Sequence, residues 1–224
     1  MRQIEIRSKE EPYIGAKIGS EEIWHRLLNA MKDAKGVHLE SILCALAAMA
    51  GYSCQAALRA LAQNSGLPET NGLSVVETHD GQQFFFGDPL NNMLFGGRMA
   101  PCNLAAGMAQ QCGCTEFPNM HDVFGYVTST VGKASFGIPR LPEGHRPGDS
   151  PINYLRALWI PLHPVVMMFC PKPSHWPVLY GLALQKGIDH GKAALDPAIA
   201  LKLIIECAAP MSKVDLGAAL SAEN

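Results

Sequence analysis

The sequence carries little charge and no excess of either sign. Only 17% of its 224 residues are Asp, Glu, Lys or Arg, with 18 basic against 20 acidic residues. Proteins that bind a phosphate backbone present clustered Lys and Arg, and no such cluster stands out along this chain. We therefore expect no nucleic-acid partner.

The short motifs of several enzyme classes are also missing. The chain contains no HExxH, no GxSxG, no P-loop and no GxGxxG placed after a strand. Gly132-Lys133 lacks the glycine loop that precedes the lysine of a P-loop. These absences remove support for a zinc peptidase, a serine esterase of the usual pattern, an NTPase or a dinucleotide oxidoreductase.

The N-terminus, MRQIEIRSKEEPYIGAKIG, has no apolar stretch of the kind that directs secretion, so we expect a cytoplasmic protein. The seven cysteines are an odd number. Cys44, Cys54 and Cys207 lie in apolar helical settings, where reduced thiols behave as small hydrophobes. A disulfide scaffold is therefore not expected.

The stretch from Gly36 to Gly66 predicts one long helix. Between His38 and Gln63 it has no Pro, Asp or Val and a single glycine, Gly51, where we expect a bend. No residue from Ile42 to Cys54 is charged, so other elements must surround this helix. The uncharged run is shorter than the roughly 20 residues that cross a bilayer, which predicts a core helix and no membrane span.

Two features favour a homo-oligomer. The central helix is rich in alanine, which lets neighbouring helices approach closely, within the chain or across a subunit contact. Between Leu90 and Thr130 only Arg98, Glu116 and Asp122 are charged, so this region must be covered by the chain or by a partner. Packing within the chain is the alternative for the alanines.

The remaining pattern predicts a predominantly α-helical α+β fold in one globular domain, residues 1–224. An amphipathic helix from Glu21 to Lys35, capped by Ser20, pairs with the central helix. A single β-hairpin joins Leu73 to Thr78 with Gln82 to Phe86, and a strand from Arg2 to Arg7 would make a small three-stranded sheet. Residues 211–224 form a flexible tail. Further helices are expected over Pro101 to Gln111, Met120 to Val131, Ile152 to Ile160, His163 to Cys170, Trp176 to Gly187 and Pro197 to Ala208.

Residues 132–151 read GKASFGIPRLPEGHRPGDSP, too dense in Gly and Pro for a regular element. Loops of this length in compact domains are often lids or binding loops, so we treat this segment as a candidate functional loop. An ordered connector on the surface is the alternative.

Cys54 is the candidate nucleophile. If the long helix breaks at Gly51, Cys54 opens its second half, a position that lowers the pKa of a thiol. His79 and Asp88, on or beside the hairpin, would supply a base and its orienting group. This arrangement is loosely similar to papain-like peptidases, although His79 falls in the hairpin turn here. An inert, buried Cys54 is the alternative.

Cys102, Cys112, Cys114 and His121 offer four soft ligands for zinc. Structural zinc sites use pairs of Cys two to four residues apart, whereas Cys112 and Cys114 form one CxC beside an isolated Cys102. This spacing favours free thiols, and we expect no metal site.

Two functional hypotheses remain. The first is a non-enzymatic binding or assembly module, because no catalytic constellation stands out. The second is a small-molecule or thiol hydrolase that uses Cys54, with residues 132–151 as its lid. No residue pattern identifies a cofactor or a ligand, although a small-molecule ligand is compatible with the loop.

Overall fold

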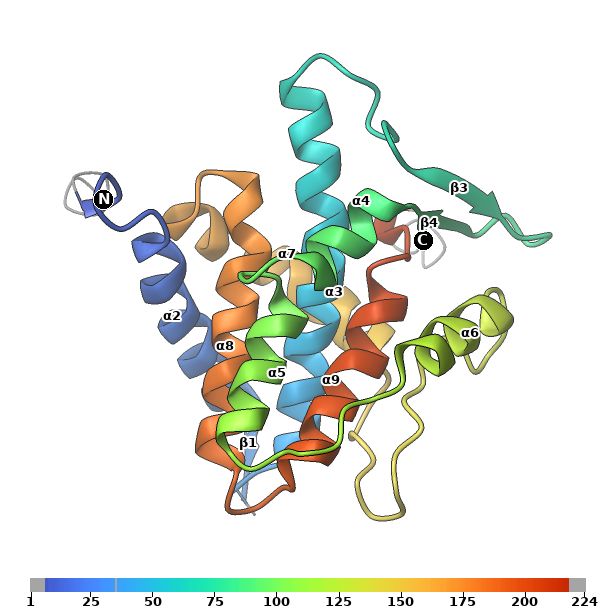
Figure 1. Ribbon diagram of the computed structural model, residues 1–224. Helices are drawn as coiled ribbons and strands as arrows, with labels where there is room; N and C mark the ends of the chain where they lie inside the picture. The colour runs from blue at the N-terminus through green and yellow to red at the C-terminus, as the bar shows by residue number, and fades with distance from the viewer. Residues whose placement is uncertain (1–6, 35, 218–224) are drawn as a thin grey trace.

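The structure is a computed structural model that describes residues 7–34 and 36–217 (Figure 1). Most of the described chain is helical, and the strands are short and antiparallel, which confirms the predicted helix-rich α+β class. The helices are α2 (Ile14–Ala30), α3 (Leu39–Asn64), α4 (Asp88–Asn91), the π-helical turn η1 (Asn92–Gly96), α5 (Pro101–Gln111), α6 (Met120–Thr130), α7 (Pro151–Phe169), the 3-10 turn η2 (Pro173–His175), α8 (Trp176–Gly191) and α9 (Pro197–Met211). The strands are β1 (Lys32–Asp33), β2 (Gly36–Val37), β3 (Ser74–Glu77) and β4 (Gln83–Phe86).

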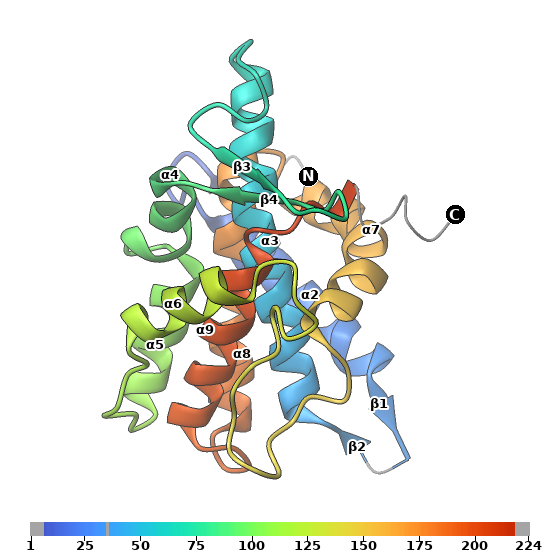
Figure 2. The same cartoon turned by 90° about the vertical axis from the view of Figure 1, so that its right-hand side faces the viewer.

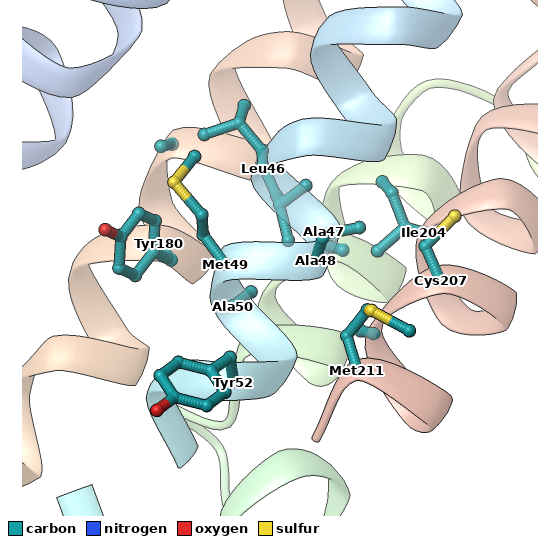
Figure 3. Packing of buried hydrophobic residues seen from close by; sticks show 14 of the residues in the cluster. Leu46, Ala47, Ala48, Met49, Ala50, Tyr52, Tyr180, Ile204, Cys207 and Met211 are labelled. Carbon is teal, nitrogen blue, oxygen red and sulfur yellow. The ribbon is translucent and has the colours of Figure 1, made fainter. Parts of the chain in front are cut away.

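Helix α3 forms the centre of the fold, as predicted. It packs against α7, α8 and α9, and every residue from Ile42 to Ala50 has no exposed surface (Figures 1 and 3). In the part of the chain that the structure describes, α3 is the one helix long and apolar enough to cross a membrane, yet 89% of its most apolar 18-residue window is buried inside the protein. Within this fold α3 is therefore a core helix.

The contact between α3 and α9 depends on Gly51. A Cβ at this position would overlap the carbonyl oxygen of Ala208 and lie 2.9 Å from its carbonyl carbon. The structure shows no helix break at Gly51, because α3 continues through this residue as one helix. Glycine is required here by the close approach of two backbones.

Most alanines of α3 are used within the chain. Ala45, Ala47, Ala48, Ala50 and Ala57 have no exposed surface and so offer none to a second copy, whereas Ala56 and Ala60 are half-buried. The homo-oligomer stays a prediction, and its remaining basis is the charge-poor region from Leu90 to Thr130.

Helix α2 begins seven residues before the predicted start. Ile14 and Ala16 are buried, and the helix packs mainly on α7 and α8. Ser20 lies inside the helix, where its hydroxyl donates to the carbonyl of Lys17 at 2.7 Å and caps nothing. The predicted N-cap is wrong because burial of the preceding turn outweighs the local capping signal.

Helix α7 is continuous where two helices were expected. Pro161 and Pro164 lie inside it and are both exposed, as are Ala157 and Ile160, the residues four positions earlier. Both prolines therefore lie on the solvent side of α7, where water can hydrate a carbonyl that loses its helical partner and so reduce the energetic cost of each proline. Burial of Trp159, Leu162 and Val166 on the opposite face holds the helix together.

The predicted hairpin is present, with β3 and β4 paired in antiparallel register. A second two-residue hairpin, β1 with β2, is one that the sequence analysis does not predict. The third segment beside β4 comes from the C-terminal region: Phe85 N donates to Lys213 O at 2.8 Å, and Asp215 N donates to Gln83 O at 3.2 Å. The strand expected over Arg2 to Arg7 falls almost wholly outside the described residues.

Residues 211–217 also differ from the prediction of a flexible tail. Met211, Val214 and Leu216 are buried, and Gln55 of α3 donates to the carbonyl of Ser212 at 3.2 Å. This segment is part of the core because it lies between α3 and β4. The rest of the predicted tail, 218–224, lies outside the described residues.

We expect Gly51→Ala to destabilise the protein by about 3 kcal/mol, because the added methyl group forces α3 and α9 apart in a close-packed core. Gly107→Ala in α5 is the matched control, since nothing lies within 4 Å of its added Cβ. The control should leave stability unchanged or raise it by up to about 1 kcal/mol through helix propensity. Urea denaturation of both variants tests the assignment, and equal effects would contradict it.

Candidate functional site

The structure does not bring Cys54, His79 and Asp88 together as a catalytic group. Cys54 lies inside α3 with no exposed surface, whereas His79 and Asp88 are exposed, at the hairpin turn and at the start of α4. Among the described residues, no hydrogen bond or ion pair joins any two of these three side chains.

The surroundings of Cys54 oppose nucleophilic chemistry. Its thiol donates to the carbonyl of Ala50 at 3.4 Å, and burial raises the pKa of Cys54 well above its ordinary value. An activated cysteine needs the opposite shift, toward the thiolate. The absence of a helix break at Gly51 removes the helix N-terminus on which the hypothesis depended.

The four candidate zinc ligands serve separate roles. Cys102 is buried in α5, and the Cys114 thiol donates to the carbonyl of Glu116 at 3.1 Å. Cys112 is half-buried at the end of α5, and His121 is exposed in the first turn of α6. In residues 7–34 and 36–217, no group of three or more His, Cys, Asp or Glu side chains is arranged to hold a metal ion.

The glycine- and proline-rich segment from 132 to 150 runs along one side of the molecule beside α9 and the first half of α3 (Figure 2). Its strongest anchor is the buried carboxylate of Glu206 in α9. This carboxylate accepts from the backbone N–H of Arg140 at 2.5 Å and pairs with the Arg140 guanidinium at 2.9 Å. The guanidinium also lies 4.2 Å from the ring centroid of Tyr126, a cation–π contact.

A second anchor lies at the start of α3. Glu40 pairs with His145 at 3.0 Å, and the Ser41 hydroxyl accepts from Gly148 N at 2.8 Å. Ser41 also contacts a ring nitrogen of His38 at 2.7 Å, and the other ring nitrogen lies 3.4 Å from Glu40. The contacts run from serine to histidine to carboxylate, as in a hydrolase triad. Ser41 is only 5% exposed and its oxygen holds the loop, so its present geometry is structural.

The start of this loop, the β3–β4 hairpin, α7 and the C-terminal segment enclose a pocket of about 390 Å³, which we call the hairpin pocket. It is lined by Asp80, Gly81, Gln82, Gln83, Phe84, Gly132, Lys133, Ala134, Phe136, Ile152, Arg156, Met211, Val214 and Asp215. Phe84 and Phe136 meet edge to face, with ring centroids 4.9 Å apart, and form its aromatic wall. The volume is typical of small-molecule sites.

The charges of the hairpin pocket are unevenly matched. Asp80 accepts hydrogen bonds from Thr78 and Gln82, and the first of these is the main cause that lowers the pKa of Asp80. Asp215 pairs with Arg59 at 3.6 Å. Within the described chain, the ammonium group of Lys133 has neither a hydrogen bond nor an ion pair. Arg156, the second cation of the lining, already has a partner, so the ammonium group of Lys133 is available to a ligand.

Lys213 lies on the other side of the C-terminal segment. It is buried, its ammonium group donates to Asn91 Oδ1 at 2.7 Å, and it lies 5.6 Å from the ring centroid of Phe86. Burial lowers the pKa of Lys213 to about 8. A lysine of this kind weakens the fold while it is charged and does so less as it loses its proton.

Sequence reasoning finds only part of this site. The density of Gly and Pro after residue 131 identifies the loop, and the hairpin is a clear local signal. For Lys133, the sequence shows only that the glycine loop of a P-loop does not precede it. Arg156 and Asp215 give no signal at all, because their convergence depends on the packing of α7 and of the C-terminal segment.

We expect thiol reactivity to follow burial. Cys112 is half-buried, and the other six cysteines, all free, are buried. A bulky thiol reagent should modify one thiol in the native protein, and Cys112→Ser should abolish this reaction, whereas all seven should react in urea. Mass spectrometry of the labelled peptides makes the assignment, and rapid native labelling of Cys54 would contradict it.

We expect the stability difference between Lys213→Met and the wild type to depend on pH. The folded-state pKa of about 8 lies below the ordinary value of 10.5, so the free-energy cost of burying the Lys213 charge is complete below pH 8 and shrinks toward pH 10.5. The wild type should gain about 1 kcal/mol relative to Lys213→Met between pH 7 and pH 9. Urea denaturation at both values measures this. The exposed-site control Lys32→Met should show no such change, and a pH-independent difference for Lys213→Met would refute the assignment.

We compared the chain with protein-family models, curated proteins and solved structures, and none of them matches it. We therefore argue function from its own residues, of which those of the hairpin pocket present the best-defined chemistry.

Proposed function

We propose that this protein is a non-enzymatic binding module whose hairpin pocket binds a small amphipathic anion. The observation that carries the proposal is the ammonium group of Lys133, which has no partner in the described chain and lies at a pocket with an apolar wall. A carboxylate or a similar anionic group would pair with Lys133. An apolar or aromatic portion of the ligand would pack against Phe84 and Phe136.

The shape of the pocket supports binding without rearrangement. Its walls come from four segments that are far apart in sequence, and each is held by bonds of its own. The loop is anchored by Glu206, and the C-terminal segment is paired with β4. A ligand that enters a preformed pocket orders few side chains, which favours affinity.

The lining residues support a binding role more than a catalytic one. None of the fourteen is a Cys, Ser, Thr, Tyr or His, so the described pocket has no thiol, hydroxyl or imidazole to act as a nucleophile or its base. Both of its carboxylates already accept hydrogen bonds or pair with Arg59. The alternative hydrolase built on Cys54 has no support from the geometry, since that thiol is sealed inside α3.

We expect the protein to bind 2-naphthoate, an aromatic ring system with one carboxylate, and Lys133→Gln to weaken this binding about tenfold. The factor corresponds to the loss of one charge-assisted hydrogen bond, about 1.5 kcal/mol. Lys32→Gln is the matched control, because it removes the same charge from β1, at the other end of the molecule from the hairpin (Figure 2).

Titration followed by naphthalene fluorescence measures both dissociation constants. The Lys32→Gln variant should bind like the wild type. Equal weakening in both variants would show a nonspecific charge effect and would contradict the proposal, as would the absence of binding to the wild type at millimolar 2-naphthoate.

A further inference from the structure

A second pocket, of about 430 Å³, lies between the α4–η1 segment, α5 and α6, which gather on one side of α9 (Figure 2). We call it the asparagine pocket. It is lined by Asn91, Asn92, Phe95, Gly96, Cys102, Asn103, Ala106, Phe117, Pro118, Met120, Phe124 and Ile205. It shares no lining residue with the hairpin pocket.

The lining of the asparagine pocket is uncharged. Eleven of the twelve residues belong to the charge-poor stretch from Leu90 to Thr130, and the three charged residues of that stretch, Arg98, Glu116 and Asp122, are not among them. The sequence predicts that this region is covered, and the described chain buries much of it but leaves the surface at this pocket open. A neutral occupant fits this lining, because a charged group would lose its hydration without gaining a counter-ion.

Aromatic side chains form the walls. Phe95 and Phe124 meet edge to face with ring centroids 5.6 Å apart, and Phe117 is 52% exposed. An exposed phenylalanine at a pocket offers its ring face to a ligand. A planar aromatic group would extend the existing pair of rings.

Three asparagines supply the polar groups. Asn103 uses its Nδ2 to donate to the carbonyls of Phe95 at 2.6 Å and Gly97 at 3.0 Å, and its Oδ1 accepts no hydrogen bond from the described chain. Asn91 uses its Oδ1 to accept from Lys213, and its Nδ2 has no partner there. The side-chain amide of Asn92 makes no hydrogen bond within the described chain. The pocket therefore offers both a donor and an acceptor, the pair that a neutral amide group recognises.

The wall that carries Asn92 and Phe95 is a π-helical turn, η1. Such turns are rare and occur frequently at functional sites. Asn103 stabilises this one, because its two bonds hold the carbonyls at the end of the turn. The same side chain thus shapes the pocket and lines it.

We propose that the asparagine pocket binds a neutral, planar aromatic molecule that carries an amide-like hydrogen-bonding group. This proposal does not rest on the hairpin pocket, because the two sites differ in residues and in charge. The ligand assigned here is neutral, whereas the ligand of the hairpin pocket is an anion.

The test uses 2-naphthamide, the neutral counterpart of 2-naphthoate, titrated against the full chain by naphthalene fluorescence. Ala106→Leu fills the asparagine pocket and should weaken 2-naphthamide binding at least tenfold, with 2-naphthoate binding unchanged. Gln110→Leu is the matched control, since it adds leucine to an exposed position of the same helix outside the pocket. It should bind both probes like the wild type.

Phe117→Ala provides a second variant in case Ala106→Leu disturbs the fold, because an exposed side chain can be removed without opening the core. It should weaken 2-naphthamide binding about fivefold through loss of ring stacking. Lys133→Gln should leave 2-naphthamide binding unchanged, so failure of one site is distinguishable from failure of the other. The proposal is overturned if the wild type does not bind 2-naphthamide at millimolar concentration, if Phe117→Ala binds it normally, or if Lys133→Gln weakens it.

Discussion

The close packing of α3 against α9 is the contact on which the rest of the structure depends. A helix with no charge from Ile42 to Cys54 is unstable unless protein surrounds it, and α7, α8 and α9 meet that requirement. Gly51 lets the backbone of α9 approach more closely than any side chain would allow. Because α3 is buried on all faces from Ser41 to Gln55, its two cysteines are core residues, and ligands can reach the protein only at the edges of the bundle.

Two buried charged side chains hold the loop and the C-terminal segment at the edge of the bundle. Glu206 is buried on α9, and it holds the long loop because a buried carboxylate needs partners, which Arg140 supplies from both its backbone and its side chain. Lys213 is buried beside α4 and β4 and ties the C-terminal segment to Asn91. The loop and the C-terminal segment are therefore ordered walls, and the hairpin pocket between them is already formed.

The two pockets differ in charge, and this difference selects different ligands. The hairpin pocket combines an apolar wall with an unpaired cation, whereas the asparagine pocket has amide groups and aromatic rings without charge. An anion gains a partner in the first and loses hydration without compensation in the second. Asn91 links the two regions, since it lines the asparagine pocket and receives the hydrogen bond of Lys213, whose own backbone pairs with β4 beside the hairpin pocket.

The sequence by itself determined the elements whose signals are local. The uncharged, alanine-rich run predicts α3, and Asn119 and Asp196 cap α6 and α9 through side-chain bonds that a sequence pattern can anticipate. Only the tertiary structure decided the rest: α7 continues through Pro161 because its opposite face is buried, and Cys54 is sealed from His79 because α3 does not break. The pockets belong to this second group, since residues such as Asp80, Lys133 and Asp215 meet only through long-range packing. Hydrogen bonds between residues close in sequence can be predicted from the local residue pattern. Contacts between distant segments cannot, because they depend on how all the core side chains pack together.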